Sequence, residues 1–325
     1  MIFLVTGGAG FIGSHIVELL VKKKHQVVVI DNFSTGNIKN IKHLKKDIKI
    51  VNASITEYNK YQKYFRNVDY VLHLAALADI VPSINQPYKY FDNNVKGTLN
   101  IVKACKKYKI KKIVYAASSS CYGLAKKFPT KETDKIDLQY PYAFSKYFSE
   151  KIIEHWSRVY NLNYISLRLF NVYGLRSRTT GAYGAVFGVF LSQKISNMPL
   201  TVVGDGNQSR DFVYVSDVAN AFYKAALSKI NNQVFNVGAG KPVSINKIVK
   251  IINSKKINIP KRPGEPDITH ANISKIKKYL KWKPTYDITK GVKLMLKNLD
   301  YWKDAPKWTP KKIQKETKNW FKYLK

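Results

Sequence analysis

The chain of 325 residues has only two cysteines, Cys105 and Cys121, and few acidic residues. The cysteines lack CxxC spacing and no His cluster accompanies them, so we expect neither a disulfide framework nor a zinc site. Both should be reduced, packed thiols. No apolar run reaches the roughly 18 residues of a membrane-spanning helix. Because the first strand starts at once, without a charged leader and apolar stretch before it, we expect a cytoplasmic protein with no membrane partner.

The shortage of acidic residues gives the chain a large positive charge. Its 56 Lys and Arg face 21 Asp and Glu, for a formal net charge of +35. Such a field can attract nucleic acid or an anionic membrane surface. The lysines are scattered through predicted helices and no recognition motif accompanies them, which favours a compositional bias. We predict no nucleic-acid partner, although an anionic small substrate would benefit from the field.

A glycine-rich turn follows the first predicted strand. The sequence contains both Gly8-x-Gly10-x-x-Gly13 and Gly7-x-x-Gly10-x-x-Gly13, directly before a predicted helix at 12–21. Glycines there allow a tight turn and let backbone N–H groups approach a pyrophosphate. A second strand ends in Asp31, whose carboxylate can receive a ribose diol. The acid favours NAD over NADP, because its charge repels a 2′-phosphate and no arginine stands beside it.

Apolar runs alternate with helical stretches through the first half of the chain. This alternation predicts a doubly wound parallel sheet of the α/β class. The predicted strands are 2–6, 26–30, 48–52, 70–74, 112–116 and 164–168. After Gly174, glycine-rich loops and short strands at 200–203 and 234–237 indicate a smaller lobe over the carboxyl ends of the strands. We predict a Rossmann-type NAD-binding domain at 1–174 and a mainly substrate-binding α/β lobe at 175–325, where the chain can cross back near 205–230.

Tyr142 and Lys146 form a candidate catalytic pair. They lie four residues apart in a helical segment that follows Pro141, so both project from one face. A tyrosine with the usual pKa near ~10 must be shifted by roughly three units to take a proton near neutrality. Lys146 and a nicotinamide charge can supply that shift. The strand before this segment ends in Ser118, Ser119 and Ser120, whose hydroxyls can bind the same substrate oxygen.

Taken in order, these features resemble the extended short-chain dehydrogenase/reductase family, and specifically its nucleotide-sugar 4-epimerases. The resemblance runs over nearly the whole chain. Further matching stretches are 73–76, 90–98, 168–174, 204–212 and 262–267.

The resemblance implies an NAD site. The residues it assigns to the cofactor are Gly7, Gly10, Phe11, Ile12, Gly13, Asp31, Asn32, Ser54, Ile55, Leu74, Ala75, Ala76, Asn94, Lys146 and Phe170. Ser54 departs from the family, which usually offers an Asp to the adenine amine, although a hydroxyl can still accept that hydrogen bond.

The resemblance also implies a UDP-sugar site in which Tyr142, Lys146 and Ser118 are catalytic. Its substrate residues are Ser118, Ser119, Ser120, Tyr142, Asn171, Arg210, Arg262 and Thr269. The two arginines match the family's phosphate ligands, a role that suits their permanent, bidentate charge. Thr269 and the segment 181–186 are similar to positions that leave room for an N-acetyl group.

The implied reaction is inversion at C4 of a UDP-hexose through a transient 4-keto sugar. Relatives that eliminate water or decarboxylate place a Glu where this chain has Ser119 and Ser120. We therefore expect an isomerase for UDP-glucose and UDP-galactose, with UDP-GlcNAc and UDP-GalNAc as further candidates. The alternatives are a UDP-glucuronate epimerase or decarboxylase, another nucleotide-sugar enzyme of this fold, or a non-catalytic nucleotide or nucleic-acid binder.

Two regions bear on partners. Similar enzymes often form homodimers through two helices, which here would span 87–108 and 142–160. The tail from Asp300 places Trp302, Trp308, Trp320 and Phe321 among lysines. A membrane-surface or partner helix would have this composition, but packing on the body is the favoured interpretation.

Overall fold

The larger of two lobes is built on a parallel sheet of seven strands. The computed structural model describes residues 1–177 and 186–324. The strands of this sheet are β1 (Ile2–Thr6), β2 (Gln26–Asp31), β3 (Ile48–Asn52), β4 (Tyr70–His73), β5 (Lys112–Ser118), β6 (Tyr164–Leu169) and β10 (Gln233–Val237). They run in the order β10-β6-β5-β4-β1-β2-β3, and every neighbouring pair is parallel. The predicted doubly wound α/β class is confirmed.

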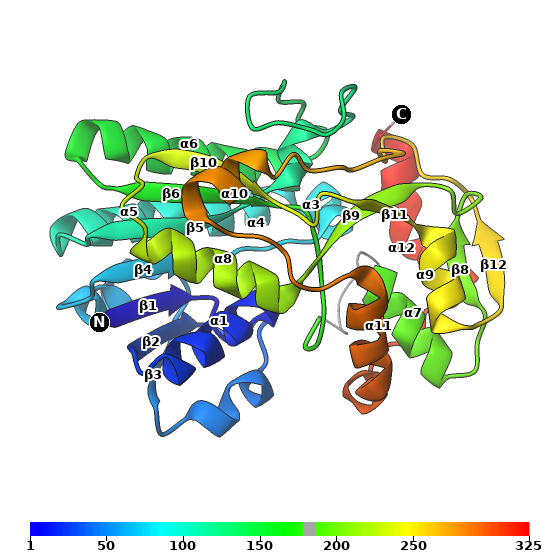
Figure 1. Cartoon of the computed structure of the whole chain (residues 1–325), viewed down its shortest axis with the longest axis horizontal. Coiled ribbons are helices and arrows are strands. Elements are labelled where there is room, and N and C mark those ends of the chain that lie inside the picture. The colour runs from blue at the N-terminus through cyan, green and yellow to red at the C-terminus, as the bar shows by residue number, and fades with distance from the viewer. Residues whose placement is uncertain (178–185, 325) are drawn as a thin grey trace.

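Helices cover both faces of this sheet, as Figure 1 shows for α6 and α8. Twelve α-helices lie in the described residues: α1 (Phe11–Lys22), α2 (Tyr58–Tyr61), α3 (Ile80–Asn85), α4 (Pro87–Tyr90), α5 (Gly97–Lys107), α6 (Pro141–Tyr160), α7 (Val186–Ile195), α8 (Val215–Leu227), α9 (Ile245–Ile252), α10 (Ser274–Leu280), α11 (Ile288–Lys297) and α12 (Pro310–Tyr323). One apolar cluster joins α1 and α8 to the sheet, and another joins α5 and α6 to its other face. The strands read as continuous apolar runs because both faces are buried.

The chain crosses back to the larger sheet after entering the smaller lobe. Helix α8 packs beside α1, and β10 pairs with β6 at the edge of the sheet. The run 234–237, which we expected in the smaller lobe, therefore belongs to the larger sheet. Its apolar pattern predicts a strand but carries no information on which strand it pairs with. The division into domains at 174 stays a prediction.

The smaller lobe contains short sheets and the C-terminal helices. Its strands are β7 (Asn171–Tyr173), β9 (Ser209–Tyr214) and β11 (Pro242–Ser244) in one sheet and β8 (Leu200–Val203) and β12 (Lys256–Ile259) in another. The buried carboxylate of Asp211 accepts backbone N–H groups of Ala239, Gly240 and Ala271, which ties β9 to two loops. The tail packs on the body, since Trp302, Trp308 and Trp320 are all buried.

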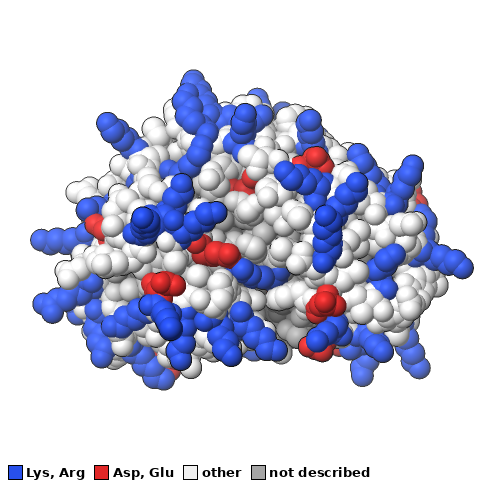
Figure 2. Space-filling view, turned by 60° about the horizontal axis from the view of Figure 1, so that its bottom comes forward, with Lys and Arg blue, Asp and Glu red and all other residues white. Residues whose placement is uncertain are grey.

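The charged side chains and the two cysteines lie in different parts of the fold. Lys and Arg are spread over the whole face seen in Figure 2 and do not gather in one patch. Cys105 and Cys121 are buried and free. Within 1–177 and 186–324, no helix combines the length and apolar character that crossing a bilayer requires.

Candidate active site

A cavity of about 500 Å³ opens at the carboxyl ends of the parallel strands. Ligands of open α/β sheets bind at this edge, because every strand of a parallel sheet ends there. Its walls come from the turn after β1, the ends of β2, β4 and β5, the start of α6, and the smaller lobe. Most of the predicted site residues are thereby brought together. The exceptions among them are Asn94, Ser119, Ser120 and Thr269, which do not line the cavity.

The glycine turn leaves a backbone cradle at one end of the cavity. Gly7 has a φ of +70°, and a Cβ on Gly13 would lie 2.1 Å from the Gly7 carbonyl oxygen. Only glycine fits such a close approach. Helix α1 starts at Phe11 with Gly10 as its N-cap and no side chain capping it. Its first N–H groups face the cavity, and together with the helix dipole they fit a pyrophosphate.

Asp31 lies at the end of β2, beside this cradle. Its carboxylate accepts the backbone N–H groups of Ala9 at 2.9 Å and Phe33 at 2.8 Å, which fix its orientation. Burial raises the pKa of Asp31, and the two N–H groups oppose that shift. A buried acceptor at this position fits a ribose diol.

The end of the cavity where we expect adenine is lined by Ser54, Ile55 and the segment after β4. The Ser54 hydroxyl is hydrogen-bonded to the Thr56 hydroxyl at 2.8 Å, so it already has a partner within its own turn. Asn94 lies behind the wall, where its amide donates to Leu77 O at 3.0 Å and accepts the Leu77 N–H at 2.8 Å. It therefore fixes the lining segment from behind, because its polar atoms are used within the protein.

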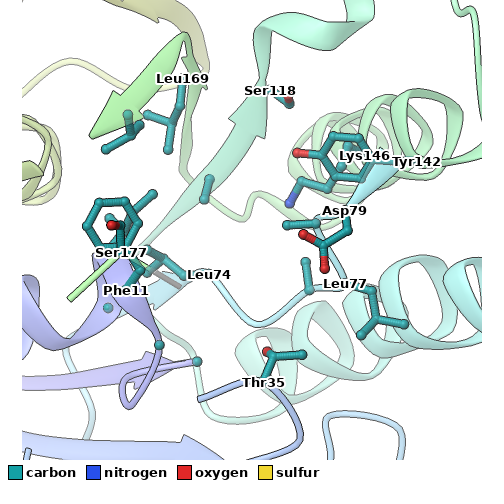
Figure 3. Close-up of a pocket in the computed structure, with 18 of the residues that line it drawn as sticks. Phe11, Thr35, Leu74, Leu77, Asp79, Ser118, Tyr142, Lys146, Leu169 and Ser177 are labelled. Atoms are coloured by element: carbon teal, nitrogen blue, oxygen red, sulfur yellow. The ribbon is translucent and has the colours of Figure 1, made fainter. Parts of the chain in front are cut away.

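Tyr142, Lys146 and Ser118 converge on one space, as Figure 3 shows. Pro141 starts α6 and places Tyr142 and Lys146 one turn apart, while Ser118 ends β5 opposite them. Ser118 lies close enough to Tyr142 to act on its pKa. Ser120 donates its hydroxyl to Ser118 Oγ at 2.8 Å, so it orients Ser118 from outside the lining.

Burial controls the protonation of this pair. It raises the pKa of Tyr142, against the lowering effect of Ser118, and the Asp79 carboxylate raises it further. Burial also lowers the pKa of Lys146 to about 7, although the Glu150 carboxylate opposes that shift. The Lys146 ammonium lies 4.2 Å from the centroid of the Tyr115 ring. The expected lowering of the pKa of Tyr142 by Lys146 together with the nicotinamide charge stays a prediction for the protein with NAD bound.

Two arginines and an acid form the opposite wall. Arg210 donates to Glu265 Oε1 at 3.0 Å, and Arg262 Nε lies 2.8 Å from Glu265 Oε2. One carboxylate thus holds both guanidinium groups beside Asn171 on the cavity lining. Charge-assisted pairs of this kind are strong and directional.

Thr269 lies behind this wall. Its hydroxyl donates to Asn171 Oδ1 at 3.0 Å and accepts the Asp211 N–H at 3.0 Å. Both hydrogen bonds direct the side chain into the protein, which is why it is not part of the lining. Of the segment 181–186, which was matched to N-acetylated sugars, residues 181–185 lie outside the described residues.

Sequence reasoning missed two acids of the lining, Asp79 and Glu265. Asp79 follows the end of β4, and Figure 3 shows its carboxylate beside Tyr142 and Lys146. It lies directly before α3, and a charged residue in the loop between a buried parallel strand and the next helix is a signal that could have identified it. Glu265 stands in the stretch that supplied Arg262, but charge pairing across a loop cannot be derived from spacing alone.

Comparisons with known proteins agree with this geometry. Residues 3–238 match the NAD dependent epimerase/dehydratase family. The chain is 39% identical over 300 residues to the putative UDP-glucose 4-epimerase of Methanocaldococcus jannaschii, covering 89% of this chain and 95% of that protein. The crystal structure of UDP-glucose 4-epimerase with UDP-glucose from Thermotoga maritima has a TM-score of 0.87 and 33% identity, covering 93% and 98% of the two chains. UDP-glucuronic acid 4-epimerase from Bacillus cereus, solved with UDP-glucuronic acid and NAD, has a TM-score of 0.85 and 31% identity, covering 93% and 99%.

Proposed function

Since the chain belongs to the NAD dependent epimerase/dehydratase family, we propose that it inverts C4 of a UDP-hexose through a transient 4-keto sugar. UDP-glucose and UDP-galactose are the proposed pair, and UDP-GlcNAc and UDP-GalNAc are further candidates. NAD is the cofactor of the enzyme. The observation that carries the proposal is the convergence of Tyr142, Lys146 and Ser118 on one space between the glycine cradle and the arginine wall.

Residues of the chain would hold NAD at one end of the cavity and the UDP-sugar at the other. The α1 N-terminus and Asp31 would bind the pyrophosphate and the adenosine ribose of NAD, and Lys146 the nicotinamide ribose. Arg210 and Arg262 are charge-assisted donors for the substrate diphosphate. Glu265 fixes the spacing of the two guanidinium groups.

Tyr142 moves the proton of the reaction. When bound, NAD supplies a hydride acceptor for C4 and a positive charge that lowers the pKa of Tyr142. The Tyr142 oxygen then takes the proton of the 4-hydroxyl, whose oxygen is hydrogen-bonded to Ser118. The cavity holds the resulting ketone while the sugar turns, and Tyr142 returns the proton after hydride has been added to the other face of C4.

We propose a neutral hexose ahead of a uronate because the chain is similar over nearly its whole length to the putative UDP-glucose 4-epimerase of Methanocaldococcus jannaschii and to the UDP-glucose 4-epimerase of Thermotoga maritima. The likeness to UDP-glucuronic acid 4-epimerase from Bacillus cereus makes UDP-glucuronate the alternative substrate to be tested.

The proposed partner is a second copy of the chain. Phe144 and Phe148 on α6 are 44% and 47% exposed, and their rings stack at 5.9 Å. Phe91 contacts Phe144 from the neighbouring segment, and Tyr88 on α4 is 88% exposed. Exposed apolar groups gathered on two neighbouring helices are typical of an interface. A dimer that pairs α6 and 87–108 would cover them.

Removal of the Tyr142 hydroxyl tests the proposed mechanism. Tyr142→Phe should lower kcat for UDP-glucose by roughly 10²–10⁴-fold, the usual contribution of a general base, and leave NAD bound. Tyr147→Phe is the matched control, because it removes a phenol from the same helix outside the cavity lining. Turnover and NAD content are measured on the same preparations. Activity of Tyr142→Phe close to that of the control would refute the assignment.

A further inference from the structure

A tryptophan of the last helix contacts the arginine wall from behind. Trp320 on α12 is 3% exposed, and its indole N–H donates to the carbonyl oxygen of Pro263 at 2.6 Å. Pro263 follows Arg262 in the loop that carries Glu265. The helix therefore fixes the backbone of this loop with a buried hydrogen bond.

The same indole also restrains the Arg262 side chain. The guanidinium carbon lies 5.1 Å from the centroid of the Trp320 ring, within the range of a cation–π interaction. Arg262 Nε meanwhile lies 2.8 Å from Glu265 Oε2. The Arg262 guanidinium therefore lies over the Trp320 ring while its Nε is paired with Glu265. These two contacts limit the rotamers of Arg262 before any ligand binds.

Trp320 reaches the catalytic helix as well. Its ring centroid lies 6.3 Å from that of Tyr140, the residue that precedes α6. Tyr140 in turn stacks on Tyr142 with ring centroids 6.4 Å apart and planes 4° from parallel. The next residue back on α12, Asn319, donates to Asn85 Oδ1 at the end of α3 at 2.8 Å. Helix α12, red in Figure 1, thus contacts the loop that carries Arg262, the residue that precedes α6, and the end of α3.

We propose that Trp320 is a positioning residue, which holds Arg262 in the geometry that binds the substrate diphosphate. The proposal rests on the proposed function for the identity of the ligand. Pre-organisation of this kind acts on affinity, because it removes the cost of ordering Arg262 on binding. The C-terminal helix completes the substrate site without touching substrate itself.

Variants of Trp320 test the proposal through binding of UDP to the full-length holoenzyme. Trp320→Phe keeps a ring and removes the N–H, and the loss of one hydrogen bond predicts a Kd for UDP raised about fivefold. Trp320→Leu also removes the ring and should raise the Kd further. NAD content should be unchanged, and with UDP-glucose the effect should fall on KM while kcat stays within about twofold of the parent.

Trp302→Phe is the matched control. It replaces another buried indole, whose Nε1 has no hydrogen-bond partner among the described residues and which does not line the cavity. Its Kd for UDP should equal that of the parent. Unchanged affinity in both Trp320 variants, or an equal loss in the Trp302 control, would overturn the proposal.

A double-mutant cycle separates positioning from general destabilisation. If Trp320 acts through Arg262, Trp320→Leu should have little further effect on UDP affinity in an Arg262→Ala background. Independent losses that simply add would contradict the proposal. If UDP affinity depends on Trp320 while no UDP-hexose is epimerised, only the proposed reaction fails. Failure of the parent to bind UDP would contradict both.

Discussion

The burial of Lys146 in the site lowers the stability of the folded protein. The ammonium is enclosed beside the Tyr115 ring, and burial lowers its pKa to about 7. In the unfolded chain the same group titrates near ~10.4. At a pH between these two pKa values, Lys146 is protonated in the unfolded state and largely neutral in the folded state. Lys146 therefore makes the free energy of unfolding rise with pH in this range. Its penalty is complete below pH ~7 and disappears toward pH ~10.

Lys146→Met should therefore stabilise the NAD-free protein while it impairs the site. We expect a gain of roughly 2 kcal/mol in the free energy of unfolding at pH ~6, shrinking as the pH approaches ~10. Urea unfolding of parent and variant at several pH values measures the difference. Lys151→Met, on the exposed side of the same helix, should show no such trend. A parent more stable than Lys146→Met at pH ~6 would refute the account.

The site residues that sequence predicts best are those fixed by local geometry. Tyr142 and Lys146 share a helix face, and Ser118 ends a strand, so the period of each element places them. Ser120, Asn94 and Thr269 have the right chemistry, but their polar atoms are used by neighbours behind the wall. Ser119 is likewise not part of the lining. Such pairing depends on tertiary contacts, and no sequence spacing reveals it.

At the scale of elements, the strands of the larger sheet were predictable and the place of the last of them in the sheet was not. Four short strands of the smaller lobe, β7, β9, β11 and β12, were not predicted. The ends of β1 to β6 fall within two residues of the apolar runs, since a strand buried on both faces must be apolar throughout. β10 has a similar run but reaches the larger sheet only after the chain has crossed the smaller lobe. Likewise, the aromatic tail predicts burial, whereas the contact of Trp320 with Arg262 arises from the docking of α12.

The exposed face of α6 that carries Phe148 allows a test of the proposed dimer. Phe148→Glu should place a charge in the proposed interface and convert a dimer into a 37.3 kDa monomer. Light scattering after size-exclusion chromatography measures the mass. Tyr279→Glu on α10, 47% exposed in the parent, is the control and should leave the mass unchanged. A parent that is already monomeric would contradict the dimer.

At the scale of the whole molecule, two lobes meet over one cavity and divide the work of binding. The larger sheet supplies the glycine cradle, Asp31 and the catalytic face of α6, while the smaller lobe supplies the arginine wall. Lys and Arg side chains are spread over the face seen in Figure 2. In the proposed function, Arg210 and Arg262 would give specificity for an anionic nucleotide sugar, and the net charge of +35 would only assist its encounter with the protein.

The central claim is that one cavity oxidises and re-reduces the same carbon of a neutral hexose. NMR on UDP-glucose deuterated at C4, with UDP-glucuronate in a parallel sample, tests it most directly. We expect UDP-galactose with deuterium retained at C4, since the deuteride leaves and returns within the enclosed site, and we expect UDP-glucuronate to be left unchanged. Absence of UDP-galactose, loss of deuterium from C4, or conversion of UDP-glucuronate in its place would contradict it.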